Sequence, residues 1–184
     1  MEARYLVVTD LETTGLNERK HEIIQIAREV IDLHSLTRVP ELTWSGYVRP
    51  LKWDKREKEA VKVNGLELWF LQQNGESLWK TLMEFSVGVP WDQASLASWG
   101  IDFEVAFLKE AFKMTDRPIP YSYRVVDIRS HAFLKRVGFC RDTEYVGMSK
   151  VAEELGIPVK EECLHDARYD TWLASEILIN LLEK

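Results

Sequence analysis

The sequence predicts an α/β domain in which a mixed sheet of five strands is flanked by helices. Two observations support this fold class. Apolar segments with strand character dominate the first part of the chain, and strands and helices then alternate. No stretch rich in Gly, Pro or Ser divides the 184 residues, and no internal repeat is visible. We therefore expect a single domain over residues 1–184.

The strands are predicted from short apolar runs bounded by turn residues. The first run ends at Asp10, and Gly15, Leu16 and Asn17 form a turn before the second, so the first three strands form a meander. The five expected strands are residues 4–9, 22–33, 42–48, 94–99 and 125–126.

The helices are predicted from apolar residues at helical spacing and from residues that end helices. Gly156 and Pro158 mark one such end. A charged segment, 55–62, is predicted as a short helix or turn. Clearer helices are expected at residues 66–71, 77–86, 102–114, 150–155 and 165–182. Another helix is expected after Asp127, which is well placed to cap it.

The composition is that of an ordinary globular protein, with 46% apolar and 29% charged residues. Thirty acids against 24 bases give a net charge of −6, which argues against coating long duplex nucleic acid through bulk charge. Binding of a few nucleotides at the end of a strand remains compatible with this net charge. The chain begins without a signal-peptide pattern and has no bilayer-spanning apolar run, so we expect a cytoplasmic protein with no membrane partner.

Asp10 and Glu12 are the first candidate functional residues. Residues two apart on a strand point to one face, so their carboxylates repel each other there. A divalent cation would relieve this repulsion, and oxygen ligands favour Mg²⁺ or Mn²⁺ over zinc. Taken alone, the pair is equally compatible with two solvated acids beside a glycine turn.

A second candidate segment contains His165 and Asp170. His165 lies at the start of the last predicted helix, where an imidazole can take a proton from water near neutral pH. Asp170 follows after slightly more than one helical turn and can bind the same metal ions as Asp10 and Glu12. Asp166 is interpreted as an acid of the first turn, favoured by the helix dipole.

Together these segments resemble the DEDDh family of DnaQ-like 3′–5′ exonucleases, which belongs to the RNase H-like superfamily. The family motif in the first strand matches Asp10-Leu11-Glu12-Thr13-Thr14-Gly15, and its His-x4-Asp motif matches His165 and Asp170. The sister branch has Tyr four residues before the last Asp, a position that Asp166 occupies here. Further similarity lies in residues 22–26, 63–66, 126–128 and 155–158.

The resemblance implies an RNase H-like fold and hydrolysis of the 3′-terminal phosphodiester of single-stranded DNA or RNA to a nucleoside 5′-monophosphate. Two Mg²⁺ or Mn²⁺ ions would be held by Asp10, Glu12, Asp170 and a middle acid, with His165 as the general base. Contacts to the terminal nucleotide are expected from Thr13, Thr14, Gly15, Leu16 and Trp99, with Leu16 placed against the base.

The middle acid departs from the family pattern. The aromatic-acid pair here is Phe103-Glu104, where the family usually has Asp, and Asp102 lies two residues before Glu104. The spacing to Phe107 and Leu108 favours Glu104 as the fourth ligand. Asp102 is the alternative, and it is otherwise interpreted as a helix N-cap. Ser98-Trp99-Gly100 leans weakly toward the RNA-trimming branch of the family.

Two other functions remain open at this stage. The unusual Glu104 is compatible with an inactive relative that only binds 3′ ends of nucleic acid. The low positive charge is compatible with a proofreading exonuclease that needs a polymerase partner. The sequence does not decide between DNA and RNA, and it does not show whether the chain forms a homodimer.

Overall fold

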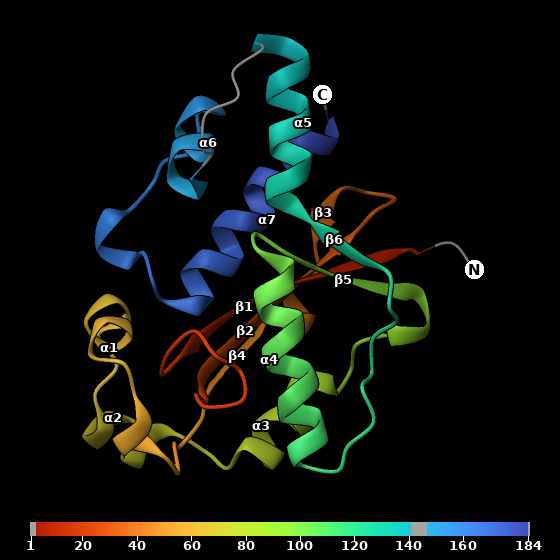
Figure 1. The fold of residues 1–184 in the computed structure, drawn as a ribbon. Helices are drawn as coiled ribbons and strands as arrows, with labels where there is room; N and C mark the ends of the chain where they lie inside the picture. Colours follow the sequence, from red (N-terminus) through yellow and green to blue (C-terminus); the bar gives the residue numbers. More distant parts are fainter. Residues whose placement is uncertain (1–2, 141–146, 184) are drawn as a thin grey trace.

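The protein is described from a computed structural model covering residues 3–140 and 147–183, with side chains from 136 to 140 left undescribed. The fold is the expected α/β arrangement (Figure 1). The strands are β1 Tyr5–Thr13, β2 Ile23–Asp32, β3 Thr37–Arg38, β4 Trp44–Tyr47, β5 Ala94–Ser98 and β6 Val125–Asp127. The α-helices are α1 Lys58–Asn64, α2 Leu68–Asn74, α3 Leu78–Ser86, α4 Ile101–Met114, α5 Ile128–Cys140, α6 Met148–Glu154 and α7 Ala167–Glu183. Short 3₁₀ helices lie at Pro40–Leu42, Trp53–Lys55, Trp91–Gln93 and Glu161–Cys163.

The sheet has six strands rather than the expected five. Its order is β3-β2-β1-β5-β6, and β4 also pairs with β2. Both β3 and β4 pair antiparallel with β2, at different positions along it, so they divide one edge of the sheet between them. The two residues of β3 are too few to show an alternating pattern, which is why the sequence did not reveal this strand.

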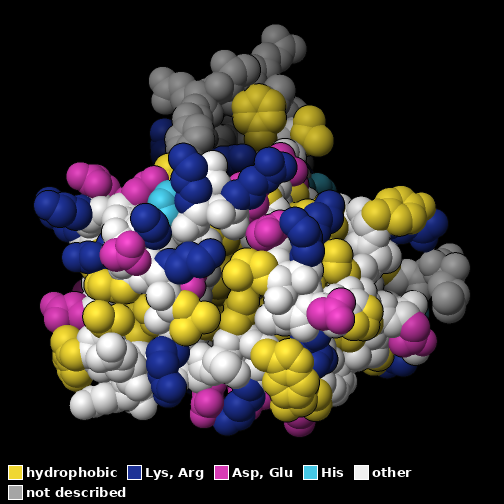
Figure 2. Space-filling view, turned by 60° about the horizontal axis from the view of Figure 1, so that its bottom comes forward, with side chains coloured by type: hydrophobic (Ala, Val, Ile, Leu, Met, Phe, Trp, Pro, Cys, Tyr) yellow, Lys and Arg dark blue, Asp and Glu magenta, His cyan; other side chains and the backbone are white. Residues whose placement is uncertain are grey.

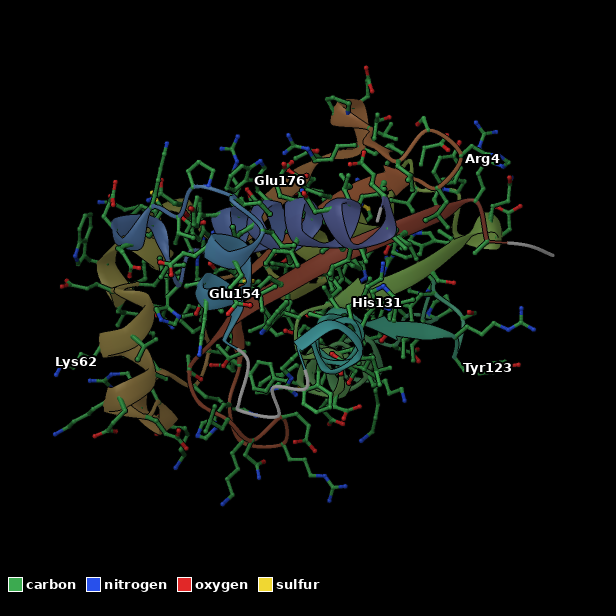
Figure 3. All side chains as sticks on the ribbon, turned by 90° about the horizontal axis from the view of Figure 1, so that it is seen from above. Arg4, Lys62, Tyr123, His131, Glu154 and Glu176 are labelled. Atoms are coloured by element: carbon green, nitrogen blue, oxygen red, sulfur yellow. The ribbon has the colours of Figure 1, made fainter. Side chains whose placement is uncertain are left out.

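Alternate residues of β1 bury their side chains in two separate cores. Val7 and Leu11 belong to the core that α3 and α4 cover, whereas Leu6 and Val8 belong to the core that α5, α6 and α7 cover. Figure 1 shows α5, α6 and α7 grouped together and α4 on the other side of the strands. Seen from above, α7 runs along β1, with Lys62 of α1 at one end of the molecule and Arg4 at the other (Figure 3). None of the helices within the described ranges is long and apolar enough to cross a membrane.

A buried arginine ties β2 to the end of α3. The Arg28 guanidinium donates hydrogen bonds to the carbonyl oxygens of Leu42, Glu84, Phe85 and Val87. Three of these acceptors belong to the last turn and cap of α3, where carbonyls lack partners within the helix. Burial lowers the pKa of Arg28 to about 10, so the side chain stays charged at neutral pH.

Replacing Arg28 with Lys will destabilise the fold by about 2–3 kcal/mol. A single ammonium cannot reproduce the planar fork, and each buried carbonyl left without a donor costs roughly 1–3 kcal/mol. Urea unfolding followed by circular dichroism measures the change. Arg19→Lys is the control because the Arg19 side chain is 83% exposed. Equal unfolding midpoints for Arg28→Lys and wild type would show that the carbonyl contacts add nothing to stability.

Candidate active site

Asp10 and Glu12 lie near the end of β1, on the face of the sheet that α7 covers. They pair with Ala27 and Gln25 of β2, and the register shifts immediately after Glu12. Asp10 and Glu12 continue the alternation of Leu6 and Val8, whose side chains contact the α5–α7 core. The two carboxylates therefore point to the same side, as the sequence predicts.

The turn that carries His165 is hydrogen-bonded to the start of α7. His165 has a φ of +64°, a left-handed conformation that costs a non-glycine residue roughly 1–2 kcal/mol. Its backbone N–H donates to Asp170 Oδ2 at 3.0 Å. Asp166 Oδ1 accepts from the Arg168 N–H at 2.9 Å, and α7 begins at Ala167, so Asp166 precedes the helix and caps it rather than lying in its first turn as expected.

Gln25 of β2 fixes this helix start to the sheet. Its Nε2 donates to Asp166 Oδ1 at 3.1 Å, and its Oε1 accepts from the Ala167 N–H at 3.3 Å. Gln25 is 2% exposed and lies directly opposite Glu12 in the register. The sheet thus determines how far the start of α7 lies from the β1 carboxylates.

The structure separates the two candidates for the middle acid. Glu104 is 5% exposed on α4 and borders the cavity formed with Asp10, Glu12 and Asp170. Asp102 is exposed in the first turn of α4 and does not line that cavity. The expectation of an N-cap at Asp102 is wrong, because α4 begins at Ile101 and Gly100 is its N-cap residue. The apolar Phe107 and Leu108 beneath Glu104 hold that face of the helix against the core.

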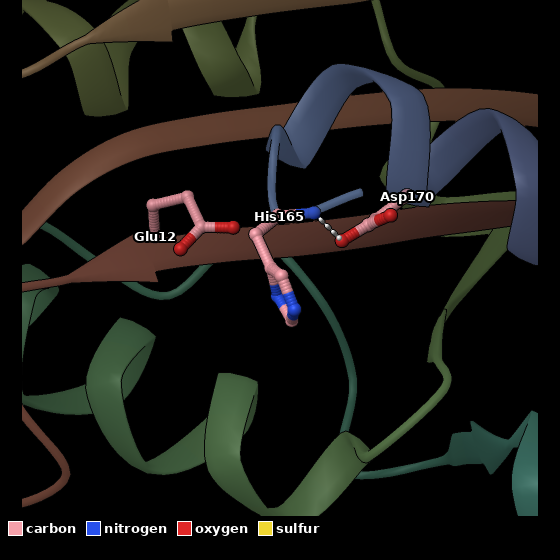
Figure 4. A group of neighbouring side chains, drawn as sticks. All are labelled: Glu12, His165 and Asp170. Atoms are coloured by element: carbon pink, nitrogen blue, oxygen red, sulfur yellow. Dashed lines mark hydrogen bonds between the residues drawn. The ribbon is translucent and has the colours of Figure 1, made fainter. Parts of the chain in front are cut away.

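Three of the side chains that line the cavity form a tight group. Ligand atoms of Glu12, His165 and Asp170 all lie within 4.8 Å of one another (Figure 4). Figure 4 shows the imidazole extending away from Asp170, while the His165 backbone N–H faces that carboxylate. Asp10 and Glu104 line the same cavity, which has a volume of about 400 Å³.

The acids of the site lie close together without enough positive charge nearby to stabilise their ionised forms. Burial raises the pKa of Asp10 well above its ordinary value, and the nearby Glu104, Asp170 and Glu12 raise it further. Burial, reinforced by Asp170, raises the pKa of Glu12 to about 8. Burial also raises the pKa of Glu104 to about 7 and that of Asp170 to about 6. Hydrogen bonds from Ser98 to Glu104 and from the His165 backbone to Asp170 offset part of these shifts.

These residues fit divalent cations bound by hard oxygen ligands. Glu104 Oε2 and Asp170 Oδ1 are buried, and neither has a hydrogen-bond partner within the described parts of the chain. Buried carboxylate oxygens without donors are costly unless a cation neutralises them. An all-carboxylate set suits Mg²⁺ or Mn²⁺, and the exposed His165 stands beside it.

The predicted nucleotide-contacting residues do not all reach the cavity. Thr13 and the 75% exposed Leu16 line it. Thr14 and Gly15 are buried beneath the turn, where the Thr14 hydroxyl accepts from the Glu22 N–H. Trp99 is half-buried against the α5–α7 core and is absent from the cavity lining. The structure therefore shows a packing contact for Trp99, and its contact with a nucleotide stays a prediction.

Several residues that shape the site were not predicted from the sequence. Besides Gln25, Asn64 of α1 hydrogen-bonds the Glu12 side chain and donates to the Thr13 carbonyl at 3.2 Å. Ser98 at the end of β5 hydrogen-bonds Glu104. Gln25 and Asn64 lie in the segments 22–26 and 63–66 that resemble the family, and Ser98 lies in Ser98-Trp99-Gly100, but no feature of these segments assigned the three residues a place at the site.

Comparison with known proteins identifies the family. The sequence profile of the RNase T exonuclease family matches residues 7–178. The chain belongs to this family. Its mixed sheet and flanking helices have the RNase H-like fold of DEDD exonucleases, as the resemblance of the motifs implied. No curated protein matches the sequence.

Solved structures of low identity share the exonuclease fold. Cell-death related nuclease 4 has a TM-score of 0.77 at 16% identity, over 98% of this chain and 64% of its own. The nuclease domain of 3′hExo, a DEDDh family member bound to rAMP, has a TM-score of 0.74 at 18% identity, covering 98% and 92%. Exonuclease I from Methylocaldum szegediense has a TM-score of 0.74 at 19% identity, covering 93% and 39%. The chain therefore spans only part of the first and third of these proteins.

Proposed function

We propose that this exonuclease is of the DEDDh type and hydrolyses the 3′-terminal phosphodiester of single-stranded nucleic acid. The whole chain would act as one catalytic domain. The observation that carries the proposal is the set of four carboxylates, all with raised pKa values, beside an exposed histidine in one cavity. Such a set is poorly suited to bind a phosphodiester without cations, because like charges repel.

Asp10, Glu12, Glu104 and Asp170 would hold two divalent ions. When bound, the ions supply positive charge for both the attacking and the leaving oxygen of an in-line displacement. His165 accepts a proton from the attacking water. The water oxygen forms a bond to phosphorus as the bond between phosphorus and the 3′ oxygen breaks. The leaving 3′ oxygen takes up a proton from solvent, which leaves a shortened strand with a 3′ hydroxyl and a nucleoside 5′-monophosphate.

The substrate is expected to bind through a few nucleotides. On the face in Figure 2, Lys and Arg side chains are interspersed with Asp and Glu, and apolar side chains lie between them. Lys62 of α1 points outward at the end of the molecule (Figure 3). Leu16 and Val63, exposed at the cavity, and the half-buried Phe103 offer apolar contacts that any base can use.

The test uses one 5′-labelled DNA and one 5′-labelled RNA oligonucleotide, each with Mg²⁺, Mn²⁺ or EDTA. We expect a ladder of strands shortened from the 3′ end, released mononucleotides, and no reaction in EDTA. The two substrates decide between DNA and RNA. Metal-dependent 3′-end binding without products would favour the binding-only relative, and activity only after adding a polymerase would favour the proofreading alternative.

His165→Asn will lower kcat by about 10²-fold and leave metal affinity unchanged. General-base catalysis contributes roughly 10²–10⁴-fold, and the lower end is expected because the exposed His165 leaves water access for proton transfer. Asn tolerates the left-handed backbone of this position, so the turn is preserved. Single-turnover rates and Mn²⁺ titration measure the two quantities. A rate within about threefold of wild type would exclude this role for His165, since that lies far below the general-base range.

A further inference from the structure

Leu16 is an apolar side chain whose place in the cavity depends on its neighbours. It is 75% exposed in the turn after β1 and lines the cavity with Val63 and Phe103. An exposed leucine has no burial of its own to fix it, so its orientation must come from the backbone on either side. Those two flanking residues are Gly15 and Asn17.

One imidazole contacts both residues that flank Leu16. The Asn17 backbone N–H donates to His21 Nδ1 at 3.0 Å. On the other side, the His21 ring lies against Gly15 so closely that a Cβ on Gly15 would stand 2.5 Å from His21 Nδ1. Glycine at position 15 thus allows the ring to approach the backbone. His21 contacts the turn immediately before and after Leu16.

His21 is itself held in a single orientation. Its side chain is 6% exposed, and its Nε2 lies 3.5 Å from Glu57 Oε1. Because Nδ1 accepts a backbone hydrogen bond, the proton of the neutral ring is assigned to Nε2, on the Glu57 side. Glu57 lines the cavity, and its own N–H donates to the Thr14 carbonyl at 2.7 Å. The turn is therefore linked to Glu57, the residue before α1, both through His21 and through this backbone hydrogen bond.

We propose that His21 is a positioning residue that holds Leu16 against the 3′-terminal nucleotide. The proposal rests on the function proposed above, since it assigns the cavity to a nucleotide. His21 touches no reacting atom in this account. It acts by restricting the Gly15–Asn17 turn, so that Leu16 is already oriented when the nucleotide arrives.

Binding of a nucleoside 5′-monophosphate, measured by calorimetry with Ca²⁺, tests this inference independently of hydrolysis. We expect His21→Leu to weaken the Kd about tenfold, equivalent to about 1.4 kcal/mol. In hydrolysis assays the same variant is expected to raise KM and to change kcat by less than about threefold, because uniform binding and not the chemical step is affected.

A double-mutant cycle with Leu16→Ala separates positioning from a general structural effect. If His21 acts through Leu16, then adding His21→Leu to Leu16→Ala will weaken Kd no further. His21→Asn, which keeps an acceptor for the Asn17 N–H, will recover part of the affinity. His34→Leu is the control, because His34 is exposed in the turn after β2.

Two outcomes overturn the inference. One is an additive cycle, and the other is a wild-type protein that does not bind the mononucleotide. If His21→Leu unfolds, the cycle is run with His21→Asn, and additivity there has the same meaning. Nucleotide binding without any hydrolysis would instead count against the proposed exonuclease activity and leave the positioning role of His21 supported.

Discussion

Asp10→Asn will lower kcat by about 10⁴-fold. Asp10 lines one cavity with Glu12, Glu104 and Asp170, and these three carboxylates add to burial in raising the pKa of Asp10. Asp10 would help to hold both proposed ions, and each ion would contribute several kcal/mol to stabilising the transition state. Single-turnover hydrolysis of the oligonucleotide that the wild type prefers measures the loss.

The same substitution will stabilise the metal-free protein at pH 8. The folded-state pKa values of the site acids lie above those of the unfolded chain, so the folded state binds more protons. The stability that this contributes is complete below about pH 4, the usual carboxyl range, and is lost as pH rises through the folded values. Those values reach about 6 for Asp170, 7 for Glu104 and 8 for Glu12.

Thermal unfolding in EDTA at pH 5 and pH 8 measures this effect. Wild type will lose stability between the two pH values, and Asp10→Asn will lose less because one repelling carboxylate is gone. At pH 8, added Mg²⁺ will raise the unfolding temperature of wild type more than that of the variant. Asp54→Asn is the control, since the Asp54 side chain is 75% exposed. If Asp10→Asn loses more thermal stability between pH 5 and pH 8 than wild type does, repulsion at Asp10 is not the cause of the pH dependence.

The fold was predictable where burial follows a local pattern. The strands β2, β4 and β5 lie within the expected segments, and β1 and β6 begin within theirs but continue past the expected end, because apolar alternation and turn residues mark these strands. The end of β1 was not predictable in this way. The strand continues to Thr13 rather than Thr9, because Asp10 and Glu12 pair with β2 although their acidic side chains resemble the end of a strand.

The candidate site was predictable only as far as its motifs are local. Asp10 and Glu12 share one strand, and His165 lies five residues before Asp170 at the start of α7, so spacing alone brings each pair together. Gln25 and Asn64 reach the site from β2 and α1, through contacts that arise only when distant segments pack. The proposed role of His21 could not be predicted from the sequence either, because it depends on contacts with Gly15 and Glu57 in the folded chain.

Glu104→Gln will lower kcat by about 10³-fold, while Asp102→Asn will leave it within about threefold. Glu104 is the buried acid of α4 in the cavity, and its Oε2 has no hydrogen-bond partner within the described residues. Gln keeps the shape and removes the charge, so loss of an ion costs about 4 kcal/mol, within the several kcal/mol of metal catalysis. Asp102 is exposed and caps nothing through its side chain, so its change in stability will stay within about 0.5 kcal/mol.

Glu104→Asp tests whether reach or charge matters at this position. The shorter side chain keeps the carboxylate but loses one methylene, and Phe107 and Leu108 anchor the helix face, so α4 cannot move closer to compensate. We expect metal binding and activity between those of wild type and Glu104→Gln, with the rate rising at higher Mn²⁺ concentration. A dead Asp102→Asn beside an active Glu104→Gln would move the fourth ligand to Asp102. Full activity of both single variants and of the double variant would leave α4 without a metal ligand, and three acids would then have to hold the ions.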